Sequence, residues 1–208
     1  MRLGVFGGSF DPVHRGHLQL AETALQQARL DRVVLIPAAK QPLKPSGPHA
    51  SDADRLAMLR LAIDAQPQLA VEPLELERGG VSYTYETLQS LAERHPGAEL
   101  WLLIGADAVA ELPQWREPAR ILALATPLIA ARPGHPWPDL SPLASLVGPE
   151  RLEAIASARQ RMPPCDVSSS DIRRRIAAGQ PWRALTDPAV ADYIEVRGLY
   201  GAAAMPLA

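Results

Sequence analysis

Eleven residues near the beginning of the chain, Gly7–His17, combine glycines with two histidines. Glycines before the start of a helix leave backbone N–H groups free to bind an anion. His14 and His17 stand three positions apart, so their rings can point to the same side. Imidazoles in that place can hold phosphate oxygens and stabilise the charge on them. The segment therefore indicates a phosphate-binding site at the start of a helix.

Other interpretations of Gly7–His17 stay open on its residues alone. Two glycines also fit an ordinary turn from a strand to a helix, and the two histidines also fit capping or core positions. A zinc site is a further alternative, but no cluster of Cys, His and carboxylate residues completes it. The spacing matches neither the G-x-G-x-x-G dinucleotide motif nor the G-x-x-x-x-G-K-[ST] phosphate loop, which excludes those two site types.

A second polar segment, Val167–Arg173, lies near the other end of the chain. Its hydroxyls and the backbone N–H groups of a helix start can meet a phosphate, and Arg173 adds a planar cation that suits the same ligand. The three serines, Ser168–Ser170, equally fit the cap of a helix when they are considered alone. The segment is thus a second candidate contact for phosphate.

Strand and helix patterns alternate along the chain. Residues 2–6 and 32–36 are short apolar runs, and apolar residues recur at helical spacing from Gly16 to Arg29. The first 37 residues therefore predict a strand–helix–strand unit of a parallel sheet. Further strands are expected over 70–76, 100–104 and 127–131, helices over 52–65, 85–94, 117–124, 150–161, 169–178 and 188–195, and irregular loops over 38–50 and 132–148.

The alternation predicts a doubly wound, Rossmann-like α/β fold, with a parallel sheet that carries helices on both faces. Ligands bind such sheets at the carboxyl ends of the strands, where the strand order reverses. The length of 208 residues suits one domain over residues 1–200, with a helical C-terminal portion of about 168–200. The last residues, 201–208, are expected to form a flexible tail.

The composition argues against several classes of protein. A net charge of −2 makes a nucleic-acid partner a poor hypothesis. Cys165 is the only cysteine, so no internal disulfide can form, which fits a reducing compartment. No apolar stretch is long enough for a signal peptide or a membrane span. We therefore expect a cytoplasmic protein that binds neither nucleic acid nor membrane.

The two polar segments resemble a known superfamily. Gly7–His17 closely resembles the G-x-F-D-P-x-H-x-G-H signature of the adenylyl- and cytidylyltransferases. Val167–Arg173 is similar to the I-S-S-T-x-I-R segment at the other end of the same catalytic core, with Ser170 in place of the usual Thr. That substitution keeps the hydroxyl.

Further segments resemble one branch of this superfamily, the bacterial nicotinate mononucleotide adenylyltransferases. Ser82–Leu88 is similar to their S-Y-T-x-[DE]-T-L segment. The other matching segments are Gly105–Asp107 with Leu112–Trp115 (G-x-D…L-x-x-W), Ala131–Gly134 (R-P-G), Gln41–Lys44 (N-P-L-K, with Gln41 in place of Asn) and Tyr193–Tyr200. Each is weak alone, but they follow in order from Leu3 to about Tyr200, and the set is therefore specific.

The resemblance implies a transfer of AMP. The phosphate of nicotinate mononucleotide would attack the α-phosphorus of ATP, and pyrophosphate would leave. A phosphate nucleophile is already ionised at pH 7, so the protein needs no general base and supplies alignment and charge stabilisation. The resemblance also implies that magnesium accompanies ATP, and we expect no metal ligand from protein side chains.

The resemblance assigns roles to individual residues. Four residues are expected to hold the triphosphate and act in catalysis: His14, His17, Lys44 and Arg173. The expected ATP-binding residues are Gly7, Gly8, Ser9, Phe10, Gly16, Gly105, Asp107, Arg132, Ser168 and Ser169. Three residues are expected to hold the nicotinate ring: Tyr83, Thr84 and Trp115. Asp107 fits either the ATP ribose or the metal, and its role is left open.

Two kinds of rival function remain. Related adenylyl- and cytidylyltransferases, such as those for phosphopantetheine or nicotinamide mononucleotide, share the first motif. Phosphopantetheine and cytidylyl enzymes do not share the segments around Tyr83 and Trp115. A module that senses nucleotides without turning them over is the second rival, and the intact histidine pair argues against it. The sequence leaves the oligomeric state open.

Overall fold

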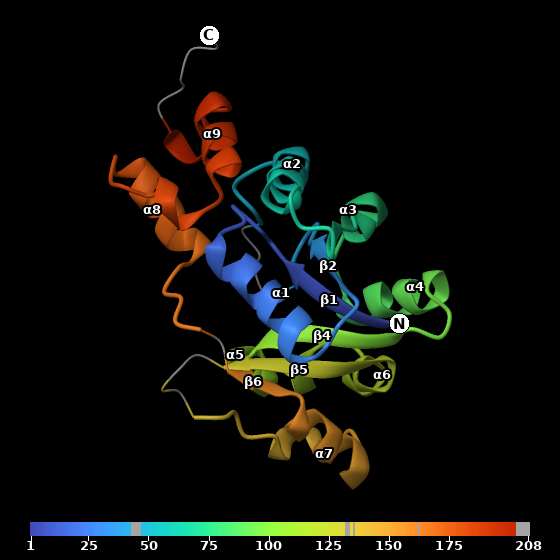
Figure 1. The fold of residues 1–208 in the computed structure, drawn as a ribbon. Helices are drawn as coiled ribbons and strands as arrows, with labels where there is room; N and C mark the ends of the chain where they lie inside the picture. Colours follow the sequence, from blue (N-terminus) through green and yellow to red (C-terminus); the bar gives the residue numbers. More distant parts are fainter. Residues whose placement is uncertain (43–46, 132–133, 135, 162, 203–208) are drawn as a thin grey trace.

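In a computed structural model, residues 1–42, 47–131, 134, 136–161 and 163–202 of the protein are described. Their framework is a six-stranded parallel sheet with the order β3-β2-β1-β4-β5-β6 (Figure 1). The strands are β1 (Arg2–Gly8), β2 (Arg32–Pro37), β3 (Leu69–Val71), β4 (Glu99–Gly105), β5 (Ala125–Ala131) and β6 (Arg159–Arg161). The chain builds outward from β1 to β3 and then returns to place β4 on the other side of β1. The strand order therefore reverses between β1 and β4, which confirms the doubly wound prediction.

Helices connect the strands and cover both faces of the sheet. The α-helices are α1 (Arg15–Gln27), α2 (Asp52–Ile63), α3 (Leu74–Arg78), α4 (Thr84–Arg94), α5 (Ala106–Glu111), α6 (Pro118–Leu124), α7 (Pro149–Ser157), α8 (Ser169–Ala177) and α9 (Pro188–Val196). Four 3₁₀ turns accompany them: η1 (Leu112–Gln114), η2 (Ser141–Leu143), η3 (Arg183–Leu185) and η4 (Leu199–Gly201). No helix in these described segments is long and apolar enough to cross a membrane.

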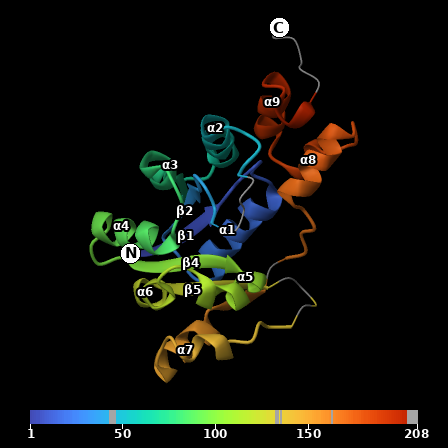
Figure 2. The ribbon, with the colours of Figure 1, turned by 180° about the vertical axis from the view of Figure 1, so that it is seen from behind.

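The sheet separates two apolar cores, because successive side chains of a strand point to opposite faces. Phe6 and Leu35 pack with α1, α2, α8 and α9 on one face. Val5 and Ile36 pack with helices α4, α5 and α6 on the other face. Figure 1 shows α1 in front of the sheet, and Figure 2 shows α5 and α6 on the opposite side. Ligand-binding loops can therefore emerge only at the two ends of the strands.

The C-terminal helices belong to the layer that contains α1. Ile172 of α8 and Ile194 of α9 are buried in the same core as the apolar side of α1. α8 and α9 lie at the end of the sheet where α1 begins (Figures 1 and 2). The portion predicted over 168–200 therefore packs against the start of the chain. The expected tail begins inside η4, and 203–208 lie outside the described residues.

Polar residues fix the start of several helices. The Oγ of Ser168 accepts a hydrogen bond from the Asp171 N–H at 3.2 Å, so Ser168 caps α8 as the serine run predicted. Ser51 caps α2 in the same way, with its Oγ 3.1 Å from the Asp54 nitrogen. Such caps satisfy N–H groups that have no partner within a helix.

The predictions were wrong for two stretches. The strand predicted over 70–76 is shorter, since only Leu69–Val71 pairs with β2, and the short helix α3 then begins at Leu74 with Pro73 as its N-cap residue. The predicted helix over 150–161 ends at Ser157, and Arg159–Arg161 pairs with β5 as the edge strand β6. Backbone pairing with an open sheet edge outweighed the local helical pattern there. The predicted loop over 132–148 also contains the single turn η2.

Candidate nucleotide-binding site

The first motif lies at the carboxyl end of the central strand. β1 ends at Gly8, the loop from Ser9 follows, and α1 begins at Arg15 with His14 as its N-cap residue. β1 is the strand at which the sheet reverses its order. The structure therefore places Gly7, Gly8, Ser9, Phe10 and Gly16 at the position where doubly wound folds bind ligands.

The two histidines form a stacked pair at the start of α1. Their ring centroids are 3.7 Å apart, and the planes differ by 22°. The backbone N–H of His14 donates to Nδ1 of His17 at 3.2 Å. Because Nδ1 accepts, neutral His17 carries its proton on Nε2, where it can donate to a ligand oxygen. The rings of Phe6 and Phe10 contact the His17 ring and fix its orientation.

The first histidine of the pair is buried. Burial lowers the pKa of His14 to about 4, so the imidazole is neutral at pH 7. A neutral state also avoids placing two positive rings in a stack. Gly16 leaves room for this ring, because a Cβ there would lie 3.1 Å from Nδ1 of His14 and 3.2 Å from Sγ of Cys165.

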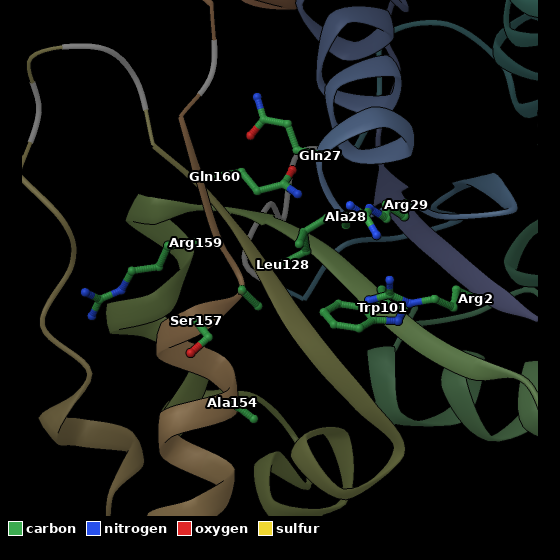
Figure 3. Close-up of a pocket in the computed structure, with 11 residues that line it drawn as sticks. Arg2, Gln27, Ala28, Arg29, Trp101, Leu128, Ala154, Ser157, Arg159 and Gln160 are labelled. Carbon is green, nitrogen blue, oxygen red and sulfur yellow. The ribbon is translucent and has the colours of Figure 1, made fainter.

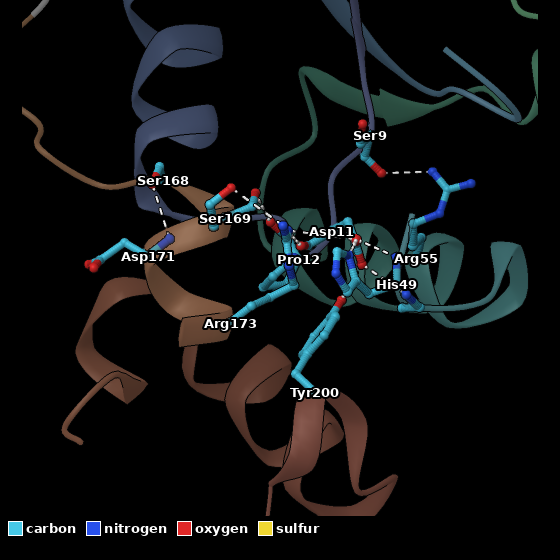
Figure 4. A network of polar contacts seen from close by, with 12 residues as sticks. Ser9, Asp11, Pro12, His49, Arg55, Ser168, Ser169, Asp171, Arg173 and Tyr200 are labelled. Carbon is cyan, nitrogen blue, oxygen red and sulfur yellow. Dashed lines mark hydrogen bonds and ion pairs between the residues drawn. The ribbon is translucent and has the colours of Figure 1, made fainter. Parts of the chain in front are cut away.

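Asp11 is the centre of a polar network that joins the loop after β1 to three other segments of the chain (Figure 4). Its carboxylate accepts hydrogen bonds from the backbone N–H of His49 at 2.7 Å, the N–H of Ala50 at 3.0 Å and the hydroxyl of Tyr200 at 2.7 Å. Nη1 of Arg173 lies 3.7 Å from the same carboxylate. Burial raises the pKa of Asp11, but these donors and the cation outweigh it and hold the pKa below its usual value.

The second motif meets the first motif directly. Nη1 of Arg173 donates to the carbonyl oxygen of Asp11 at 2.6 Å, and the hydroxyl of Ser169 donates to the carbonyl oxygen of Pro12 at 2.9 Å. Residues that are about 160 positions apart in sequence therefore line one site. Ser168 lies in the same segment, where its hydroxyl caps α8. The predicted proximity of the two motifs is what the structure shows.

Two further side chains hold the loop after β1, and no sequence pattern predicts them. Arg55 of α2 is fully buried and donates to the carbonyl oxygens of Ser9 and Ala38, both at 2.7 Å. Thr186 donates to the carbonyl oxygen of Val13 at 2.7 Å. An arginine in an amphipathic helix normally faces solvent, so sequence reasoning left it unmarked. Asp11 and Tyr200 lay inside matched segments but received no role.

Gly105 and Asp107 lie at the same edge of the sheet. Gly105 ends β4, the neighbour of β1, and is the N-cap residue of α5. Asp107 is in the first turn of α5 and is exposed. The carboxyl ends of β1 and β4 thus supply two of the predicted nucleotide-binding segments.

The predicted nicotinate residues come from two neighbouring segments. Tyr83 is the N-cap residue of α4, and Thr84 is its first helical residue. Trp115 follows η1, is half-buried and packs against the second core. The guanidinium of Arg116 lies over the Tyr83 ring at 5.0 Å, which brings the two segments together. Arg116 is a cation at this position that the sequence reasoning missed.

The remaining predicted residues are placed only in part. Lys44 and Arg132 lie outside the described residues. Gln41, which replaces the family's Asn, accepts a hydrogen bond from the Ser9 hydroxyl at 3.0 Å. In the described part of the chain, no group of three or more His, Cys, Asp or Glu side chains could hold a metal ion.

A hollow of about 400 Å³ lies away from these residues (Figure 3). Its lining includes Ala28 at the end of α1, Trp101 of β4, Leu128 of β5 and Gln160 of β6. Arg2, at the amino end of β1, also lines it. It therefore lies toward the amino ends of β1 and β4, whereas the histidine pair lies at the carboxyl end of β1.

Comparison with known proteins agrees with this geometry. A model of the cytidylyltransferase-like family matches residues 5–175, which include both motifs. This chain belongs to that family. Members of the family are nucleotidyltransferases, and the match spans the sheet, the histidine pair and Arg173.

Close relatives define the branch. A probable nicotinate-nucleotide adenylyltransferase from Roseiflexus castenholzii is 48% identical over 96% of this chain and 98% of its own length. One from Rhodopirellula baltica is 44% identical over 95% of this chain and 92% of its own. The cytidylyltransferase-like chain described here therefore groups with the nicotinate-nucleotide adenylyltransferases.

A solved structure shares the fold. The nicotinic acid mononucleotide adenylyltransferase of Plasmodium falciparum, complexed with NaAD, has a TM-score of 0.74 and 18% identity. The alignment covers 96% of this chain and 97% of that chain. At this identity the likeness shows the fold of the nucleotidyltransferase.

Proposed function

We propose that this nucleotidyltransferase joins nicotinate mononucleotide to the AMP part of ATP, giving nicotinate adenine dinucleotide and pyrophosphate. One observation carries the proposal. The stacked His14–His17 pair stands at the start of α1, at the reversal point of the sheet, and Arg173 is held beside the same loop. Imidazole N–H groups, a helix start and a guanidinium are the groups that bind a polyphosphate.

The reaction needs charge stabilisation more than proton transfer. An oxygen of the mononucleotide phosphate forms a bond to the α-phosphorus of ATP, and the bond from that phosphorus to the bridging oxygen of the β-phosphate breaks. The attacking phosphate is ionised at pH 7, so no base has to remove a proton. Negative charge accumulates on the leaving pyrophosphate, which donors fixed in advance can stabilise.

The two histidines suit this task in different ways. His17 presents an Nε2–H donor, because its Nδ1 is occupied by the N–H of His14. His14 supports His17 by stacking and also contributes a neutral ring at the helix start. We assign both residues to the α- and β-phosphates, together with Lys44. Magnesium is expected to enter with ATP as part of the substrate.

Arg173→Lys should lower kcat/KM for ATP by about tenfold with little change in Tm. The guanidinium of Arg173 holds the Asp11 carbonyl at 2.6 Å and can still direct other N–H groups at phosphate. Lysine offers a single point charge and cannot do both. Arg174→Lys is the matched control, because Arg174 lies next in α8 and is exposed. Unchanged ATP kinetics in Arg173→Lys would show that Arg173 only holds α8 in place and does not contact ATP.

The nicotinate end of the site is assigned to Tyr83, Thr84 and Trp115. The half-buried indole of Trp115 can stack on a pyridinium ring, which carries a positive charge in the nucleotide. Thr84 begins α4, so the first N–H groups of this helix have no acceptor within it and can meet a carboxylate. Arg116 adds positive charge over Tyr83.

Arg116→Gln should raise KM for nicotinate mononucleotide by about threefold and leave KM for the amide mononucleotide unchanged, because an exposed cation attracts only the carboxylate, and weakly. Arg120→Gln is the control, since Arg120 lies over the neighbouring Tyr85 ring at 5.1 Å with similar geometry. An equal KM change for both mononucleotides would exclude a role of Arg116 in choosing the acid.

A substrate panel tests the proposed function. With ATP and magnesium, pyrophosphate release is measured for nicotinate mononucleotide, nicotinamide mononucleotide, phosphopantetheine and no acceptor. We expect the fastest release with nicotinate mononucleotide. Faster release with phosphopantetheine would favour the sister enzyme, and binding of ATP without release would favour a sensing module. We further expect this reaction to take place in the cytoplasm, with no nucleic acid or membrane as partner.

A further inference from the structure

The hydroxyl of Tyr200 reaches the loop after β1 from the far end of the chain. Tyr200 lies in η4, beyond residues 5–175 that match the family model. Its hydroxyl donates to Oδ1 of Asp11 at 2.7 Å across 189 positions of sequence. Its φ of 58° places the backbone in the left-handed region, which bulky residues adopt only when surrounding contacts hold them there. The contact with Asp11 is one such constraint.

Asp11 contacts Arg173 through both its backbone and its side chain. The backbone of Asp11 accepts the 2.6 Å hydrogen bond from Nη1 of Arg173, and its carboxylate lies 3.7 Å from the same atom. Oδ2 receives the N–H of His49, whereas Oδ1 receives only Tyr200 and the N–H of Ala50 in the described network. Removing the Tyr200 hydroxyl therefore halves the donors on one oxygen of the carboxylate that anchors Arg173 (Figure 4).

We propose that Tyr200 is a positioning residue for adenylyl transfer, which acts through Asp11 to hold Arg173 and the phosphate-binding loop in their productive arrangement. The inference rests on the proposed function, because it takes Arg173 as a phosphate contact. A misplacement of about 1 Å is enough to cost a large factor in rate when catalysis depends on alignment. Tyr200 itself need not touch the substrate.

The chain contains a matched comparison. The hydroxyl of Tyr193 in α9 donates to Oδ1 of the buried Asp54 at 2.9 Å, and Asp54 is also bonded to Ser51 and Arg197. Tyr193 and Tyr200 are both half-buried residues of the C-terminal portion that donate to a buried aspartate. Only the aspartate contacted by Tyr200 holds Arg173.

The test compares Tyr200→Phe with Tyr193→Phe by Tm and by steady-state kinetics with ATP and nicotinate mononucleotide at 25 °C. We expect similar, small decreases in Tm for the two variants. For Tyr200→Phe we expect kcat to fall about tenfold with KM for ATP within twofold of wild type. For Tyr193→Phe both constants should stay within twofold. An unchanged kcat in Tyr200→Phe, or an equal loss in Tyr193→Phe, would overturn the inference.

A double variant tests the route through Arg173. If Tyr200 acts by holding Arg173, adding Tyr200→Phe to Arg173→Lys should change kcat by less than twofold. A further tenfold loss in the double variant would show that Tyr200 acts by another path and would refute the inference. Failure of the proposed function is distinguishable, because wild-type protein would then form no dinucleotide from nicotinate mononucleotide.

Discussion

His17→Ala is expected to lower kcat about 10²- to 10³-fold while the protein stays folded. The structure gives the reason: Nδ1 of His17 accepts the His14 N–H, which places the proton of the neutral ring on Nε2, and we assign this N–H to a phosphate oxygen. The loss of one donor that acts in the transition state typically has this magnitude. Steady-state kinetics measure the loss, and circular dichroism and Tm report the fold.

Other histidine variants make this result specific. His95→Ala should keep kcat within twofold, because His95 lies at the end of α4, far from the loop after β1 in the fold. His14→Ala should reduce kcat somewhat less than His17→Ala but lower Tm more, because the His14 ring is buried and leaves a cavity. A folded His17→Ala protein with near-normal turnover would contradict the assigned role.

The enzyme is expected to use nicotinate mononucleotide about ten- to a hundredfold better than nicotinamide mononucleotide. Selectivity for nicotinate over nicotinamide mononucleotide requires hydrogen-bond donors that face both carboxylate oxygens. We propose that the N–H groups at the start of α4, beside Thr84, are these donors. The amide presents its own NH₂ group there, and an unsatisfied buried donor costs about 1–3 kcal/mol. Competition between the two mononucleotides, followed by the dinucleotides formed, measures the ratio.

Trp115 should contribute to the affinity for both mononucleotides rather than to the selectivity between them. Stacking of a pyridinium ring on an indole is worth about 0.5–2 kcal/mol and is nearly the same for acid and amide. Trp115→Ala should therefore weaken both substrates by similar factors. If this variant changed only the ratio of the two substrates, the division of roles between Thr84 and Trp115 would be wrong. Equal use of acid and amide by the wild-type enzyme would reject the donor geometry at α4.

Much of the fold follows from local patterns. Runs such as residues 2–6 and 100–104 are apolar over the length of a strand and became β1 and β4. β6 could not be predicted in this way, because Arg159–Arg161 has no apolar pattern and is a strand only through pairing with β5. Helix α5 was not predicted either, because its first residues, Ala106 and Asp107, belong to the G-x-D motif and show no helical pattern of apolar residues.

The candidate site, like the fold, was predictable only in part. The motifs predict one site for His14, His17 and Arg173, because the resemblance implies that both segments belong to one catalytic core. The support for these residues was not predictable, since it depends on contacts between distant segments. The buried Arg55 and the link from Tyr200 to Asp11 are tertiary contacts that no local spacing encodes.

We propose above all that the protein transfers AMP from ATP to nicotinate mononucleotide, and labelled ATP tests this transfer most directly. ATP labelled with ³²P at the α-phosphate is incubated with the protein, magnesium and nicotinate mononucleotide, and the products are separated. We predict that the label appears in nicotinate adenine dinucleotide and that unlabelled pyrophosphate forms in equal amount. Release of the label as free AMP would contradict this prediction. Transfer of the label to a different acceptor, with none to nicotinate mononucleotide, would contradict it as well.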